Sequence, residues 1–188
     1  AVDGATPLDM IAADTTRRLS NWLGVLGTWR SWGPVPEYAT LWALGVRLLG
    51  KPDGGISKAA LAMVLAFAPP HVTPYREALQ GLVTDQTFRS ELTKFSPAPG
   101  ADGGIGTEHR GPMLPLLLRL LFGRVSARSG VASRAALHAR RAAILAYVGG
   151  MHRRELSFLV YLTLRAFTVS MTGGAQGGGS GAKPPHHY

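Results

Sequence analysis

Arginine is concentrated in the second half of the chain, where its guanidinium groups could bind phosphate. Residues 110–165 contain ten arginines and a single acid, Glu155. Residues 1–108 hold nine Lys/Arg and ten Asp/Glu, a net charge of −1, and residues 109–188 hold eleven and one, a net of +10. Together these give the +9 of the whole chain. Charge segregated in this way indicates an acidic partner for the basic half, and nucleic acid is the usual one.

Six of the arginines are predicted to contact phosphate because they fall near predicted helix ends, in turns or at the edges of apolar stripes. At such places a side chain and nearby backbone amides can face the same phosphate. These contacts would position the protein on a nucleic acid without reading its sequence. The alternative is a solvated basic face that binds nothing. The six residues are Arg124, Arg128, Arg134, Arg140, Arg153 and Arg154.

Two further arginines are predicted to serve the core. Arg119 lies in an almost wholly apolar segment, and Arg141 lies inside the apolar stripe of its predicted helix. Because an unpaired buried charge is costly, each should be paired with a carbonyl at a helix C-terminus or with a carboxylate. Arg140 falls at the edge of the same stripe, where its side chain can reach solvent. The stripe consists of Leu137, Ile144, Leu145 and Val148.

Other chemistry has little support in the sequence. The chain has no cysteine, its histidines lack metal-ligand spacing, and its basic half offers one carboxylate for acid–base work. Gly103-Gly104-Ile105-Gly106 is not followed by Lys-Ser/Thr, so it is a loop rather than a phosphate cradle. The longest apolar stretches, 113–122 and 156–167, contain arginine and fall short of the roughly 18 residues of a membrane span. We expect a soluble protein that is not an enzyme, with no cofactor, metal, membrane or small-molecule substrate.

The elements that must position these residues are predicted to be helices throughout. Apolar residues recur at helical spacing, and no strand pattern competes. Ser57 and Thr73 are predicted N-caps, and Trp22 and Trp42 are predicted core residues. The predicted helices cover residues 7–26, 36–49, 57–67, 74–82, 85–95, 112–125, 133–148 and 152–167.

Short helices joined by tight turns predict stacked helical hairpins. The run Ser57-Lys58-Ala59-Ala60-Leu61 resembles Ser133-Arg134-Ala135-Ala136-Leu137, which follows it 76 residues later. Two repeats of about 40 residues, as in HEAT arrays, would give this offset. The predicted fold is therefore all-α, an α-solenoid of HEAT-like antiparallel helix pairs.

The predicted organisation has three parts. Residues 1–35 form an N-terminal helix and linker, residues 36–168 form the HEAT-like helical repeat region, and residues 169–188 form a disordered Gly/Pro-rich tail. Because the chain begins with alanine rather than methionine, we expect it to be a fragment of a longer protein.

The order of motifs from residue 51 onward resembles one known family. The most specific runs are His71-Val72-Thr73-Pro74-Tyr75-Arg76 and Leu118-Arg119-Leu120-Leu121-Phe122-Gly123-Arg124. They are similar to the U3 small nucleolar RNA-associated protein 20 family, also called down-regulated in metastasis. The resemblance covers about residues 41–167, whereas residues 1–40 match only as generic helices. The supporting runs are Lys58-Ala59-Ala60-Leu61, Phe88-Arg89-Ser90-Glu91-Leu92, Glu108-His109-Arg110 and Arg140-Arg141-Ala142-Ala143-Ile144-Leu145.

The resemblance implies a nucleolar role. The family is a very long HEAT-type solenoid of the small-subunit processome, so a non-enzymatic scaffold that supports pre-rRNA processing, 18S rRNA and 40S ribosomal subunit biogenesis is expected. The implied partners are pre-rRNA or a U3 snoRNA-containing particle and other processome proteins. No catalytic residue is carried over. The alternative is a solenoid adaptor that binds an acidic protein segment without direct RNA contact.

Overall fold

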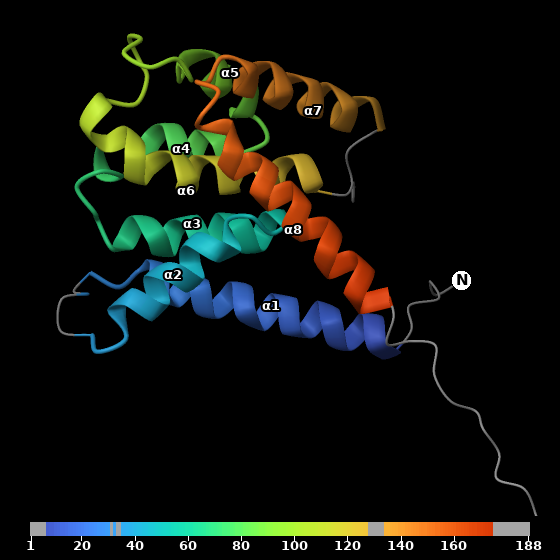
Figure 1. The fold of residues 1–188 in the computed structure, drawn as a ribbon. Coiled ribbons are helices and arrows are strands. Elements are labelled where there is room, and N and C mark those ends of the chain that lie inside the picture. Colours follow the sequence, from blue (N-terminus) through green and yellow to red (C-terminus); the bar gives the residue numbers. More distant parts are fainter. Residues whose placement is uncertain (1–6, 31, 33–34, 128–133, 175–188) are drawn as a thin grey trace, which may run out of the picture.

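The computed structural model of the chain describes residues 7–30, 32, 35–127 and 134–174. Every regular element within these ranges is helical, which confirms the all-α class (Figure 1). Arg128 and Ser133 lie outside the described residues, as does the predicted tail from residue 175. The elements are α1 (Pro7–Gly27), α2 (Tyr38–Leu48), α3 (Gly54–Ala66), the 3-10 helix η1 (Thr73–Tyr75), α4 (Arg76–Val83), α5 (Phe88–Lys94), α6 (Thr107–Ser126), α7 (Arg134–Gly149) and α8 (Leu156–Gly174).

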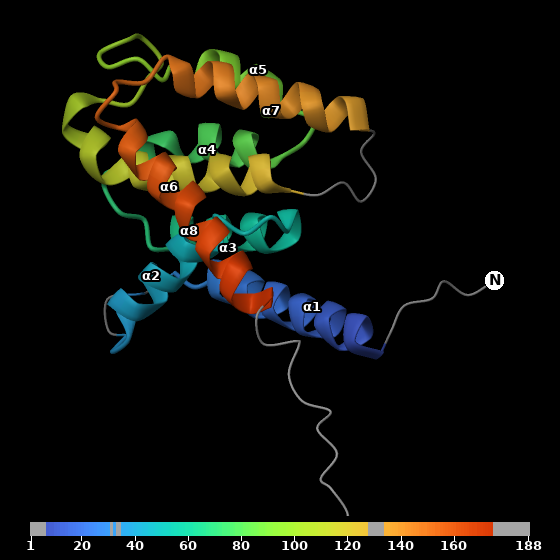
Figure 2. The same cartoon turned by 45° about the vertical axis from the view of Figure 1, so that its right-hand side comes forward.

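The helices are stacked in layers that follow the order of the chain except that α6 lies below α5 (Figure 1). In Figure 1, α1 and α2 lie lowest, α3 lies above them, α4 and α6 come next, and α5 and α7 lie uppermost. Direct contacts join α1 and α2 to α3, α3 to α4 and α6, and α5 and α6 to α7. Helix α1, assigned from sequence to a separate segment, thus packs on the helical region. Helix α8 runs obliquely down one side of the stack and packs on α6 (Figure 2).

Helix α6 lies at the centre of the stack, as its nearly continuous apolar sequence predicts. It contacts α2, α3, α4, α7 and α8. Met113, Leu117, Leu120 and Leu121 of this helix are completely buried. Each fully buried side chain of this size contributes about 1.5–3 kcal/mol relative to an exposed one. Packing on α6 therefore largely sets the positions of the two helices that follow it, α7 and α8.

The start of α6 differs from the prediction. The helix begins at Thr107 rather than at Pro112, and both Pro112 and Pro115 lie inside it. Proline has no N–H, so these two residues leave the carbonyls of Glu108 and Gly111 without a helical donor. Both of those residues are exposed, so solvent can hydrogen-bond the freed carbonyls and the helix continues through the prolines.

Two predicted N-caps are wrong. Asp53, rather than Ser57, caps α3 by accepting a 2.8 Å hydrogen bond from the backbone N–H of the third residue of the helix. Ser57 is buried inside the helix and donates to the carbonyl of Leu49 at 3.1 Å. Thr73 opens the 3-10 helix, and its hydroxyl donates to the carbonyl of Pro69 at 2.9 Å. Both hydroxyls therefore tie a helix to a preceding carbonyl instead of capping it.

The last helix begins and ends later than predicted. Residues 152–155 form a turn, and α8 starts at Leu156. It then runs to Gly174, past the tail boundary that the sequence predicts at residue 168.

The two similar runs in the sequence, residues 57–61 and 133–137, do not lie in equivalent environments. Ala60 and Leu61 of α3 are completely or almost completely buried. Their counterparts on α7 are Ala136, which is exposed, and Leu137, which is half-buried. The match therefore gives no support for a repeat of the structure.

The tryptophans divide between core and surface. Trp22 was predicted to be buried, but 69% of it is exposed, because the neighbouring Leu23 occupies the buried face of α1. Trp42 is half-buried and meets the ring of Phe67 edge-on at 5.5 Å, as predicted for a core residue. Trp32 stacks on the same phenylalanine at 4.1 Å and is also buried.

The close approach of α6 to the α2–α3 connection gives a first prediction. A Cβ at Gly123 would lie 2.7 Å from the carbonyl oxygen of Leu49 and 2.8 Å from that of Lys51. Because backbone must shift to relieve this clash, Gly123→Ala should lower the free energy of unfolding by about 1–3 kcal/mol. Gly111→Ala in the same helix meets nothing within 4 Å and should be neutral or stabilising. Urea titration of both variants measures the difference, and equal stabilities would contradict the packing.

Candidate nucleic-acid interface

The arginines predicted to contact phosphate separate into two groups in the structure. Arg124 and Arg140 converge on one carboxylate and are largely shielded, whereas Arg134, Arg153 and Arg154 are exposed. Arg128, the sixth, lies outside the described residues. The six predicted residues therefore do not form one uniform basic surface.

The shielded group is organised by Asp85, in the α4–α5 connection. Nη2 of Arg124 donates to its carboxylate at 2.5 Å, and Nη2 of Arg140 donates at 3.0 Å. The side chain of Arg124 is 8% exposed, and its guanidinium lies 5.0 Å from the centre of the Phe88 ring. The hydrogen bond from Arg124, helped by the charges of Arg124 and Arg140, lowers the pKa of Asp85. A phosphate would have to compete with this carboxylate to reach either guanidinium.

The sequence predicts Arg141 inside the apolar stripe of α7 and Arg140 at its edge, and the structure reverses the two positions. Tyr147 is buried although it was left out of the predicted stripe, and Leu145 is 63% exposed although it was included. The buried face is rotated accordingly, so Arg140 lies on it and Arg141 is exposed. Nε of Arg141 donates to the carbonyl of Val125, in the last turn of α6, at 3.1 Å. The predicted pairing with a helix C-terminal carbonyl is confirmed, but the predicted burial is not.

Arg119 is a half-buried core residue, as predicted, with a different kind of partner. Its Nη1 donates to the carbonyl of Pro115 in its own helix at 3.1 Å. Its guanidinium lies 4.5 Å from the centre of the Phe158 ring, a cation–π contact that joins α6 to α8. Burial, followed by the nearby charge of Arg165, lowers the pKa of Arg119. Arg119 thus contributes to packing rather than to ligand binding.

The ion pair between two residues of the basic half, Arg110 and Glu155, was not predicted from the sequence. Arg110 donates to both carboxylate oxygens of Glu155, through Nε at 2.5 Å and Nη2 at 2.8 Å. Nη2 also donates to the carbonyl of Pro97 at 2.7 Å, and Glu155 accepts from the backbone N–H of His152 at 3.0 Å. The two side chains are 9% and 17% exposed. The hydrogen bond from Arg110 is the main cause of the lowered pKa of Glu155.

The sequence did contain a signal for this pair. Glu155 is the one acid among ten arginines in residues 110–165, which favours an arginine as its partner. The partner lies 45 residues away, however, and ten candidates of the same chemistry are available. Only the packing of α8 against α6 identifies Arg110.

The exposed group lies in two places. Arg134 is the first residue of α7, and Arg153 and Arg154 lie in the turn before α8. None of the three forms an ion pair with a carboxylate of the described residues. The 16 residues of α7, about 24 Å of helix, separate the two places. The structure therefore brings Arg153 and Arg154 together but leaves Arg134 at a distance.

Two histidines of the described part, His71 and His109, have packing roles. Nδ1 of His109 lies 3.1 Å from the hydroxyl of Tyr75, which accepts from the backbone N–H of Gly106 at 2.8 Å. His71 meets Trp42 edge-on, and burial, followed by His109, lowers the pKa of His71. Among the described residues, no three His, Asp or Glu gather closely enough to hold a metal ion. The helices in the same part of the chain are too short or too polar to cross a membrane.

The burial of the Arg110–Glu155 pair gives a second prediction. Glu155→Gln removes the charge that compensates a guanidinium exposed by only 9%, so it should lower the free energy of unfolding by about 3 kcal/mol. Urea titration at neutral pH measures this. Asp14→Asn is the matched control, because its partners Arg17 and Arg18 are 76% and 75% exposed. The control should lose less than about 1 kcal/mol.

The pH dependence of the same variant checks the cause. Because the folded-state pKa of Glu155 is lowered, its contribution is present above the ordinary carboxylate pKa, about 4.3, and is lost as pH falls through the lowered value. Gln does not titrate, so the stability difference between wild type and Glu155→Gln should close in acid. A difference that stayed constant into acid would contradict an ionic origin.

The chain is similar in sequence to proteins of one known family. A sequence profile described as U3 small nucleolar RNA-associated protein 20, N-terminal, matches residues 13–181, and so extends into α1, beyond the 41–167 range noted above. The protein named U3 small nucleolar RNA-associated protein 20 in Schizosaccharomyces pombe is 31% identical over 127 residues, 68% of this chain. The one of the same name in Saccharomyces cerevisiae is 35% identical over 77 residues, 41% of this chain.

The chain spans 5% of the length of the first relative and 3% of the second. The profile match takes in α2 to α7 whole, most of α1 and all of α8, and with them every arginine described above. With nine-tenths of its length inside that match, the chain belongs to the U3 small nucleolar RNA-associated protein 20 family.

Proposed function

We propose that this chain is part of a non-enzymatic scaffold of the small-subunit processome. In this role it supports pre-rRNA processing, and with it 18S rRNA and 40S ribosomal subunit biogenesis, in the nucleolus. Its partners are pre-rRNA or a U3 snoRNA-containing particle and other processome proteins. The name of its relatives, which are U3 small nucleolar RNA-associated proteins, supports a place in that particle.

The observation that carries direct RNA contact is the group of exposed arginines beside α7. Arg134, Arg153 and Arg154 have no carboxylate partner in the described part of the chain, so their charge is available to phosphate. Contacts of this kind fix register and orientation on RNA and give binding a steep salt dependence. Arg128 belongs to the same proposal. Arg124 and Arg140 could contact RNA only if a phosphate replaced Asp85 as their hydrogen-bond partner.

The proposed architecture is a HEAT-like solenoid of antiparallel helix pairs. Helices α6 and α7 run in opposite directions and are in contact (Figure 1). Large apolar side chains are exposed on α1, among them Ile11, Trp22 and Val25, and on α8, among them Val160 and Leu164. In a solenoid, each repeat buries such faces against its neighbours. The exposed faces therefore fit a segment that neighbouring helices cover in a longer array.

Salt-dependent RNA binding tests the proposal. Changing Arg134, Arg153 and Arg154 together to Gln should weaken binding of single-stranded RNA and lower the slope of log affinity against log salt by about 2 units. Fluorescence anisotropy over a series of KCl concentrations measures both. The control changes Arg17, Arg18 and Arg89 to Gln, which removes the same charge from exposed positions in the other half of the chain.

The control should keep most of the salt slope. If both triple variants lose the same slope, the binding reflects net charge alone and the arginine group has no special role. If neither loses affinity, the chain does not use these residues to bind RNA, and the protein-binding adaptor becomes the better explanation.

A further inference from the structure

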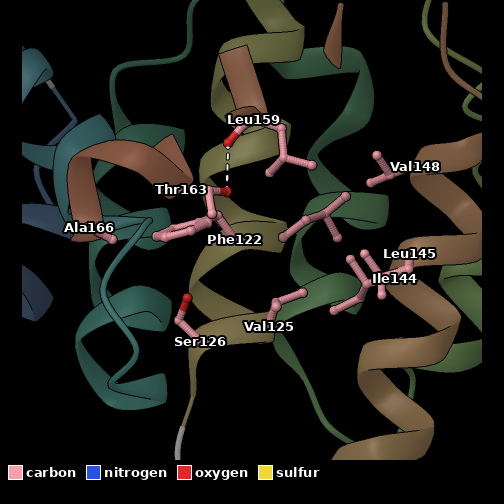
Figure 3. A pocket seen from close by; sticks show the side chains of 10 residues that line it. Phe122, Val125, Ser126, Ile144, Leu145, Val148, Leu159, Thr163 and Ala166 are labelled. Carbon is pink, nitrogen blue, oxygen red and sulfur yellow. Dashed lines mark hydrogen bonds between the residues drawn. The ribbon is translucent and has the colours of Figure 1, made fainter. Parts of the chain in front are cut away.

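An apolar groove of about 470 Å³ lies between α6, α7 and α8 (Figure 3). Phe122 and Val125 contribute to it from α6, Leu145 and Val148 from α7, and Leu159 from α8. Leu145, on the rim, is 63% exposed. A large exposed leucine beside other apolar walls marks a surface that gains free energy when it is covered.

The walls of this groove offer few polar partners. Eight of its ten lining residues are apolar, and the other two are Ser126 and Thr163. The hydroxyl of Thr163 donates to the carbonyl of Leu159 in its own helix at 2.9 Å (Figure 3). A phosphate, sugar or base would lose its hydration here without replacement hydrogen bonds. Aliphatic side chains fit the chemistry of the groove better.

The length of the groove suits about two turns of helix. Its lining extends along α8 from Leu159 to Ala166 and along α6 from Leu121 to Ser126. At 1.5 Å per residue, the stretch on α8 is about 10 Å long. An amphipathic helix that presents apolar side chains at positions i, i+3 or i+4, and i+7 spans this distance on one face.

The rim of the groove is positively charged. Arg141 is held at the edge by its hydrogen bond to the carbonyl of Val125, a lining residue. Neither α7 nor α8 contains an acidic residue. A complementary partner therefore carries Asp or Glu beside its apolar face.

We propose that this groove docks an amphipathic helix of another protein, with aliphatic side chains on the docked face and acidic residues beside it. The residues of this chain that lie outside the described ranges would contribute little to filling the groove. Residues 1–6, 128–133 and 175–188 contain two valines and no Leu, Ile, Met or Phe.

A labelled designed peptide tests the proposal. It carries Leu at i, i+3, i+4 and i+7 and Glu at the flanking positions, and it should bind the chain in a fluorescence anisotropy titration. Leu145→Gln should weaken binding about tenfold or more, since a docked leucine contact is lost. Leu164→Gln is the matched control: Leu164 is 60% exposed, on α8, and does not line the groove.

Charge and specificity are checked with the same titration. Arg141→Gln, or a peptide with Lys in place of Glu, should bind several-fold more weakly, whereas Leu164→Gln should bind as the wild type does. Absence of binding, or equal weakening by Leu145→Gln and Leu164→Gln, overturns the proposal. So does self-association of the chain that Leu145→Gln abolishes, or displacement of the peptide by single-stranded RNA that depends on Leu145. RNA binding through Arg134, Arg153 and Arg154 is a separate result and can succeed or fail independently.

Discussion

The ion pair between Arg110 and Glu155 fixes where the last helix begins, and both proposed surfaces depend on that position. It joins the central helix α6 to the turn before α8 through a guanidinium that is 9% exposed. Moving the turn would leave that charge unpaired in the core, which is strongly unfavourable. Arg153 and Arg154 lie in the same turn, and the groove wall formed by α8 follows directly from it. One ion pair therefore positions both the turn that carries Arg153 and Arg154 and the wall that α8 contributes to the groove.

Much of the fold could be predicted because most helices bury one clear apolar stripe. Leu61 of α3 and Phe88 of α5 are buried as expected. Errors arose where two neighbouring large apolar residues compete for the buried face. On α7, leaving out Tyr147 and including Leu145 rotated the predicted face. On α1, the sequence could not show whether Trp22 or its neighbour would meet α3. Local periodicity identifies a helix, but the packing partner selects its buried face.

Less of the site could be predicted, because the environment of an arginine is set by distant residues. Asp85 draws in Arg124 from 39 residues away and Arg140 from 55, and no local pattern connects them. The arginines at the start of α7 and in the turn before α8 were identified correctly as exposed, because turns lie at surfaces whatever packs elsewhere. The family resemblance was readable from the runs at residues 71–76 and 118–124, and the profile match confirms it.

The division of the arginines into structural residues and RNA-facing residues is the central claim. Ultraviolet crosslinking in cells of the protein that carries this chain, with attached nucleotides mapped by mass spectrometry, tests it most directly. Nucleotides are expected on the peptides that contain Arg134, Arg153 and Arg154, and not on the peptide of α1 that contains Arg17 and Arg18. Crosslinks confined to residues 1–108, or none on the basic half, would contradict the claim.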